Sequence, residues 1–336
     1  MGWSFEVNSK ASSLQVIHMK ARKDAAIRVV DKRGRGALAV AESETSLATR
    51  TDRRDHAVLL GYYDRIDARN FLESTGLEES LIAALLLKRT KAQERAKSLP
   101  PLTEEPRGAQ PITDPEANYE IERVMQLPDC EEIFPRGAWT AGLVEISKLI
   151  PFQPSLDVSY AESLGSPDLS SSRILSAVKL CFSDGRSTAL GINVDQSQKS
   201  ITITGINPTL QVRGVQYGRQ QQDGPFIVSM MISAAPNVVQ VSQFGGRCFL
   251  VSGNHRAYRL MKAGFSHVPC MVREAKSIEE TGARGLSFFP DSVLMAPRPP
   301  LFPDFADKVL GVIVPLRAVS KVIRIRPDEY SVLQSG

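Results

Sequence analysis

Three neighbouring side chains that can hydrogen-bond an anion stand in the stretch VSGNHRAYRLMKAG. Asn254, His255 and Arg256 follow Gly253, a residue that permits a tight turn and the close approach of a ligand to the backbone. An arginine can hold phosphate through two parallel hydrogen bonds, and an asparagine can cap a helix or bond a ligand. A histidine can act as a general acid or as a phosphate ligand. The pattern predicts a phosphate-binding corner without a Walker lysine.

The elements around these residues must position them. RCFLVSG is typical of an apolar strand, and the residues from His255 to Ala263 have helical character, with Gly264 at the position after the helix end. The first N–H groups of such a helix have no partner within it, and its dipole attracts anions. The alternative is a plain strand–turn–helix corner, with a capping Asn254 and two surface side chains. In both cases we expect Arg256 to be exposed and cheap to remove.

The fold class follows from the pattern between residues 119 and 336. SITITGI and HVPCMV read as strands, and NVVQVSQF and RCFLVSG flank Gly245-Gly246 as a hairpin. SAVKLCFSDGRSTALGINV reads as two further strands around Asp184-Gly185. Several strands, one helix and another strand indicate an α+β domain with a mixed sheet. A proline-rich loop, with Leu301, Phe302 and Phe305 as anchors, and terminal strands complete it.

The N-terminal region differs in composition. We expect residues 1–99 to form a basic region with one long helix, capped by Thr75 and Glu78, and residues 100–118 to form a proline-rich linker. The first 70 residues are polar and read as irregular. A basic arm there could hold the phosphates of a nucleic acid, or it could be a solvated extension. Its basic residues are Lys20, Arg22, Lys23, Arg28, Lys32, Arg33 and Arg35.

Composition limits the class of protein. The chain has 336 residues, 42% of them hydrophobic, a net charge of +4 and four cysteines with no C-x-x-C spacing. No apolar run approaches the ~20 residues of a membrane span, and no signal peptide is evident. We therefore expect a cytoplasmic protein that does not contact membranes. No histidine has a His or Cys partner at metal-ligand spacing, so no metal site is predicted.

The segment FLVSGNHRAYRLMKAGFSHVPCMV resembles the signature of the ParB/sulfiredoxin-like superfamily, in which it binds the phosphates of a nucleotide. The resemblance implies that Gly253, His255 and Arg256 contact phosphate. A second stretch, VEISKLIPFQPS, resembles the family's entry strand and turn, with Gln153 at the matching polar position. The interval between the two stretches is longer than the family pattern implies, so we expect a strand-rich insertion in this α+β domain. A nucleoside triphosphate with Mg²⁺ would be a fitting ligand.

Several positions depart from that pattern. Ser155 stands where ParB proteins usually have arginine, and Asn254 stands where sulfiredoxins have their reacting cysteine. No helix-turn-helix pattern follows Arg273. These departures argue against a ParB-type CTP site, sulfinic-acid repair and centromere partitioning. The free-serine kinases of the superfamily need a carboxylate base, for which Glu145 and Asp157 are the nearest upstream candidates.

Three functions stay open, beside the alternative that the ligand-binding motif is vestigial and the domain only mediates assembly. The leading one is a protein that binds a nucleotide or other phosphate-bearing ligand at Gly253–Arg256. The second is an enzyme, a nuclease, nucleotide hydrolase or phosphotransferase with His255 as the catalytic group, which would require an acidic residue or a metal within reach of His255. The third is a non-enzymatic DNA-binding or RNA-binding protein that uses the basic N-terminal region. His267, before VPCMV, could belong to the pocket or lie at a strand end.

Overall fold

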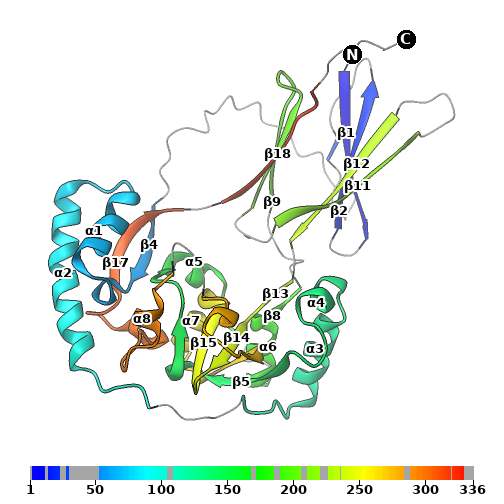
Figure 1. Ribbon diagram of the computed structural model, residues 1–336. Helices are drawn as coiled ribbons and strands as arrows, with labels where there is room; N and C mark the ends of the chain where they lie inside the picture. The colour runs from blue at the N-terminus through cyan, green and yellow to red at the C-terminus, as the bar shows by residue number, and fades with distance from the viewer. Residues whose placement is uncertain are drawn as a thin grey trace, which may run out of the picture. The chain divides into compact units, whose positions relative to one another are not determined.

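The computed structural model describes the chain in segments (Figure 1). These are residues 53–103, 109–167, 172–184, 190–205, 210–219, 226–234, 236–283, 288–318 and 320–328. Three strands near the N-terminus are described by their backbone alone: β1 (Gly2–Ala11), β2 (Leu14–Arg22) and β3 (Arg28–Val29).

The chain divides into two units that alternate along the sequence. Unit 1 comprises Met1–Thr49, Asp184–Ala235 and Val319–Gly336, and unit 2 comprises Arg50–Ser183 and Pro236–Ala318. The division therefore differs from the one expected at residues 100–118, because that stretch and the helical region before it both lie within unit 2. Where this stretch is described, it is bound to the rest of unit 2: the N–H of Leu102 donates to the carbonyl oxygen of Pro297 at 2.8 Å.

A five-stranded mixed sheet in unit 2 carries the corner, in the order β5-β16-β14-β15-β6; β5, β14 and β15 are labelled in Figure 1. Strands β14 and β15 form the expected antiparallel hairpin, and Gly245 and Gly246 between them both have positive φ. Strand β15 runs parallel to β6, and β14 runs parallel to β16. The mixed pairing agrees with the predicted α+β class. The strands are β5 (Thr140–Glu145), β6 (Leu149–Pro151), β14 (Gln240–Phe244), β15 (Arg247–Ser252) and β16 (His267–Glu274).

Helix α7 (Asn254–Lys262) follows β15 and contacts the sheet at β16. It begins one residue earlier than predicted and ends before Gly264, whose positive φ fits the expected position after the helix. Leu260 of the helix is fully buried with Phe249 and Leu250 of β15 in one hydrophobic core. The apolar strand and the apolar helix face are therefore what hold the corner in place.

Helix α6 (Arg173–Cys181) corrects one expectation, because the sequence had indicated a strand there. The side chain of Ser172 caps it by accepting from the N–H of Leu175. Leu175, Val178 and Cys181 recur every third residue and are buried, so the short apolar run has a helical period. The expected hairpin also fails on its first arm: β8 (Phe182–Ser183) pairs with β13 (Asn237–Val238) instead.

The other part of unit 2 is a three-stranded sheet, β17-β4-β7, with two helices. The predicted long helix is present as α2 (Glu79–Ser98), but Thr75 does not cap it. Thr75 instead ends the preceding helix, α1, and its hydroxyl donates to the carbonyl oxygen of Leu72. Gly76, with a positive φ, then reverses the chain. The bounds are α1 (Arg65–Ser74), β4 (Arg53–Val58), β7 (Ser155–Asp157) and β17 (Val312–Arg317).

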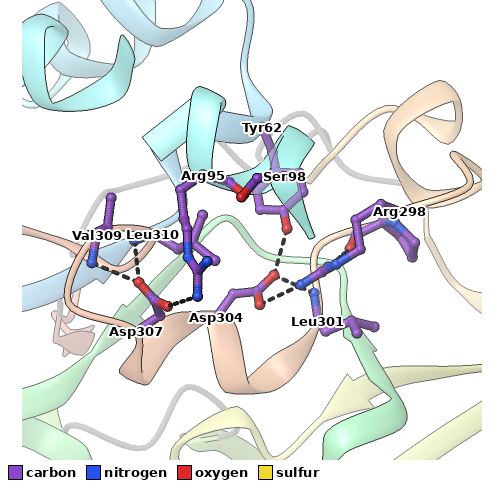
Figure 2. Close-up of polar contacts among 10 residues, drawn as sticks. Tyr62, Arg95, Ser98, Arg298, Leu301, Asp304, Asp307, Val309 and Leu310 are labelled. Atoms are coloured by element: carbon purple, nitrogen blue, oxygen red, sulfur yellow. Dashed lines mark hydrogen bonds and ion pairs between the residues drawn. The ribbon is translucent and has the colours of Figure 1, made fainter. Parts of the chain in front are cut away.

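Further helices complete unit 2. The predicted linker ends early, because Asp114 caps helix α3, which begins at Pro115. The proline-rich C-terminal segment lies on unit 2, with Phe302 and Phe305 buried as expected. Asp304 between them binds Tyr62 and Arg298 (Figure 2). The helices are α3 (Pro115–Met125), α4 (Pro128–Ile133), α5 (Val158–Ser163) and α8 (Asp291–Leu294).

Unit 1 is built of strands. One sheet has the order β11-β12-β2-β1-β3, so the N-terminal segment expected to be irregular contributes three strands. A second sheet has the order β18-β10-β9, and β10 is the strand predicted from SITITGI. Lys23, Lys32, Arg33 and Arg35 of the basic arm lie outside the described residues. The bounds are β9 (Leu190–Asp195), β10 (Ser200–Gly205), β11 (Leu210–Arg219), β12 (Phe226–Ala234) and β18 (Lys321–Ile325). Among the described helices of the whole chain, none is long and apolar enough to cross a membrane.

Candidate functional site

The corner between β15 and α7 is shaped by Gly253. This residue has φ of 97° and ψ of 19°, a left-handed conformation that favours glycine. A Cβ atom at this position would lie 2.6 Å from Cγ2 of Val239. The sequence suggested that glycine leaves room for a ligand, whereas the close neighbour in the structure is the chain's own Val239. Gly253 is therefore required for the turn itself.

The N-terminus of α7 presents free backbone donors. The carbonyl oxygen of Gly253 accepts from the N–H groups of both Arg256 and Ala257, each at 3.0 Å. The N–H groups of Asn254 and His255 precede this first helical bond, so the helix itself offers them no acceptor. The positive end of the helix dipole lies at the same place. An anion is the ligand that such an end favours.

The two segments that carry the family resemblance meet here. Strand β6 pairs in parallel with β15, with Ile150 opposite Phe249. This pairing brings Gln153, just beyond β6, to Asn254, just beyond β15. The Asn254 Nδ2 atom donates to Oε1 of Gln153 at 3.5 Å, a long hydrogen bond. Asn254 is only 7% exposed, and its Oδ1 atom is buried without a hydrogen-bond partner.

Arg256 is placed differently from the expectation. Its side chain is only 9% exposed, and its Nη1 atom donates to the backbone oxygen of Asn237. Burial lowers the pKa of its guanidinium below the ordinary value. The prediction of an exposed Arg256 is therefore wrong, because the first turn of α7 is covered and this side chain points into the protein. Its positive charge still lies at the corner.

His255 lies beside α5 and the β4–β7 pair. Its ring meets the ring of Tyr160 edge to face, with 4.8 Å between the centroids. Burial lowers the pKa of His255 to about 4, assisted by the positive charge of Arg256 and opposed by Asp157. His255 is therefore a neutral imidazole at pH 7 when no ligand is bound. In this form it offers one donor and one acceptor.

Two further polar residues, His56 and Asp157, act electrostatically on His255. They are partners in the β4–β7 register, and Nε2 of His56 lies 3.8 Å from Oδ2 of Asp157. Arg54 approaches the same carboxylate oxygen at 3.5 Å, while the other oxygen caps α5 through the N–H of Tyr160 at 2.7 Å. Burial lowers the pKa of His56, against the effect of Asp157. The sequence offered Asp157 as a candidate but gave no signal for His56.

The remaining candidates lie elsewhere in unit 2. Glu145 and His267 face each other in the β5–β16 pair, and β5 is the edge strand opposite β6. Of the two upstream carboxylates considered from the sequence, Asp157 is therefore the one near the corner. His267 contacts Gln110 and Ser266 rather than the corner residues. Cys248 accepts a hydrogen bond from Gln243 at 3.4 Å within the hairpin.

Within the described segments, no group of three or more His, Cys, Asp or Glu side chains is placed to hold a metal ion. Comparisons with protein-family models, with curated proteins and with solved structures found no match to this chain.

Proposed function

We propose that the protein binds a nucleotide or a related phosphate-bearing ligand at the corner Gly253–Arg256, in the manner that the ParB/sulfiredoxin resemblance implies. The observation that carries the proposal is the amide of Asn254. It is buried in the first turn of α7, its Oδ1 atom has no partner, and its Nδ2 atom reaches Gln153. A buried acceptor without a partner costs about 1–3 kcal/mol, and an incoming donor would recover it.

The chemistry of the ligand follows from what the corner lacks. The free N–H groups of the first turn call for an anionic acceptor, whereas Oδ1 of Asn254 calls for a donor. A nucleotide supplies both, since its phosphates are anionic and its sugar and base carry hydroxyl and amino groups. Free phosphate would satisfy only the first requirement.

The test is calorimetric titration of the full-length chain with ATP, GTP, CTP and UTP, each with Mg²⁺. A nucleotide at a hundred times its Kd should also stabilise the fold by about 2.7 kcal/mol. Asn254→Asp places a negative charge in the first turn and should abolish binding. Gln110→Glu is the matched control, because it makes the same charge change at the opposite sheet edge. Equal binding by both variants, or no binding of any nucleotide by the wild type, would refute the proposal.

A second candidate function is phosphoryl transfer or phosphate hydrolysis at the same corner. It is favoured by one observation: the ring of Tyr160 packs against His255, and the N–H of the same Tyr160 donates to Asp157, whose charge raises the pKa of His255. An acidic group near His255 is what the enzymatic interpretation of the sequence required. Release of inorganic phosphate from the bound nucleotide, lost in Asp157→Asn while binding persists, would support an enzyme. Unchanged release in that variant would exclude Asp157 from the reaction.

The nucleic-acid-binding interpretation uses the basic N-terminal region, residues 1–99, in which the side chains of residues 1–49 lie outside the described ones. It stays a prediction, and its measurement is the salt dependence of binding with and without residues 1–49.

A further inference from the structure

We infer that His56 is a second imidazole of the ligand site and that His56 and His255, linked through Asp157, take up a proton together with the bound anion. The inference deepens the proposed function and rests on it. It concerns a residue outside both motif segments and a property of binding that the motif does not imply.

The first argument is geometric. Strand β4 and helix α7 both pack against strand β7 and helix α5, the elements at whose junction Asp157 lies. His56 lies opposite Asp157 in the β4–β7 register, with Nε2 at 3.8 Å from the carboxylate. His255 lies against Tyr160, whose own N–H is bound by Asp157. One carboxylate can therefore stabilise a positive charge on either imidazole.

The second argument is the set of unsatisfied polar atoms. Among the described residues, the buried side-chain nitrogen and oxygen atoms without a hydrogen-bond partner are Nδ1 and Nε2 of His56 and Oδ1 of Asn254. Native proteins leave few such atoms, and each calls for an explanation. Here Asn254 is the first residue of α7, and His56 acts electrostatically on His255, the second residue of that helix. Atoms that a ligand is to contact are expected to lack protein partners.

The third argument is charge. The groups that act on His56 are Asp157, Arg54 and Asp55, and those that act on His255 are Asp157, Arg256, Tyr160 and His56 itself. The positive charges of the two arginines are offset by the negative charges of the two aspartates. The net charge of these residues is therefore close to zero while both imidazoles are neutral. A polyphosphate therefore enters a site with little net positive charge to balance it.

The bound anion changes the balance at the imidazoles. Burial disfavours their charged forms in the free protein, and burial is the largest cause of the lowered pKa of both. A neighbouring anion favours the imidazolium and raises the pKa. Wherever the pKa in the complex exceeds that in the free protein, binding takes up protons. Affinity should then increase as pH falls toward the pKa of the free site.

The experiment is calorimetric titration of the full-length chain at pH 6 in buffers with different ionisation enthalpies. The probes are inorganic sulfate, which does not itself titrate near this pH, and ATP with Mg²⁺. We expect the binding heat to depend on the buffer in the sense of proton uptake. We also expect the affinity for sulfate to rise up to about tenfold for each unit of falling pH, the limit for one proton.

Matched variants assign the proton. His56→Asn and His255→Asn should each reduce proton uptake, and the double variant should abolish it, while His267→Asn should leave it unchanged. Circular dichroism and thermal unfolding check that each variant is folded. If a variant does not fold, titration of the imidazole Cε1–H signals of the wild type by NMR, with and without sulfate, measures the same change.

The outcomes separate the two proposals. Binding of either probe without proton uptake, or without a rise in the pKa of the two imidazoles, overturns the inference and leaves the proposed function standing. Uptake that persists in the double variant also overturns it. A wild-type chain that binds neither probe overturns the inference, and it overturns the proposed function as well if GTP, CTP and UTP also do not bind.

Discussion

The Nη1 atom of Arg256 donates a hydrogen bond to the backbone oxygen of Asn237, which ties the first turn of α7 to β13. The sequence favoured an exposed guanidinium held ready for phosphate, but the side chain is buried and partly used within the protein. Its role in the fold and its positive charge at the corner can be measured separately.

Arg256→Ala should lower the free energy of unfolding by about 2–3 kcal/mol, because it removes a charged donor from a partly buried hydrogen bond to the backbone oxygen of Asn237. Urea denaturation measures the loss. Lys262→Ala is the matched control, since Lys262 is an exposed cation on the same helix, and it should change stability by less than about 0.5 kcal/mol. Equal stability of the two variants would show that Arg256 is not a structural residue.

His255 should make the stability of the protein depend on pH. The unfolded chain binds a proton near the ordinary pKa of 6.5, whereas the folded chain binds it only near pH 4. Stability is therefore full above pH 6.5 and falls as the pH drops from 6.5 to 4, by about 3 kcal/mol over that range.

The measurement for His255 is the midpoint of urea unfolding at several pH values, compared between the wild type and His255→Asn. Taking this difference removes the contributions of the other titrating groups. The variant should lose less stability than the wild type on acidification. Parallel curves would mean that His255 is not buried as a neutral imidazole.

Gly253 supports a prediction about the turn. Gly253→Ala should destabilise the protein in two ways, through its positive φ and through contact of the new Cβ with Val239. Gly137→Ala is the matched control, because Gly137 has φ of 82° and nothing within 4 Å of a Cβ. The control variant should lower the free energy of unfolding only by the cost of a left-handed backbone conformation at alanine, about 1–2 kcal/mol.

A double variant isolates the contact at Gly253. Val239→Ala removes the Cγ2 atom that the new Cβ would meet, so it should reduce the excess cost of Gly253→Ala over Gly137→Ala. Thermal unfolding of the single and double variants gives the coupling between the two positions. An absence of coupling would mean that the backbone conformation alone requires glycine.

The comparison between sequence and structure shows which features are local. The Gly245-Gly246 hairpin and the strand, turn and helix around Gly253 were predictable, because short-range turn and periodicity rules determine them. Helix α6 was not, because a short apolar run suits a strand or a buried helix equally. The division into two units could not be predicted either, because each unit is assembled from segments far apart in the chain.

Some residues of the candidate site could likewise be predicted from the sequence, and others could not. Asn254 and Gln153 were named from motif segments, and parallel pairing of their strands brings them together. His56 could not be found, because its relation to Asp157 is created by the β4–β7 register and not by spacing along the chain. The buried side chain of Arg256 donates to the backbone oxygen of Asn237 in β13. The residue type alone does not reveal this contact between distant segments.

The last prediction concerns the polar group that holds the C-terminal segment of unit 2 (Figure 2). The hydroxyl of Tyr62 donates to Oδ2 of Asp304 at 2.6 Å, and Arg298 donates to Oδ1 at 2.8 Å. Asp304 is only 5% exposed. Tyr62→Phe removes one donor to a buried carboxylate and should cost about 1.5–3 kcal/mol of unfolding free energy.

An independent consequence is a dependence on alkaline pH. Burial and the charge of Asp304 raise the pKa of Tyr62 well above its ordinary value of 10. The unfolded chain therefore loses this proton first, so the stability contributed by Tyr62 declines as pH rises past 10. Tyr62→Phe should remove that part of the decline, as followed by urea unfolding between pH 8 and pH 11.

Tyr119→Phe is the matched control, because Tyr119 is 70% exposed, and it should unfold like the wild type at every pH. If the Tyr62 and Tyr119 variants behaved alike, the Tyr62–Asp304 hydrogen bond would contribute nothing to stability.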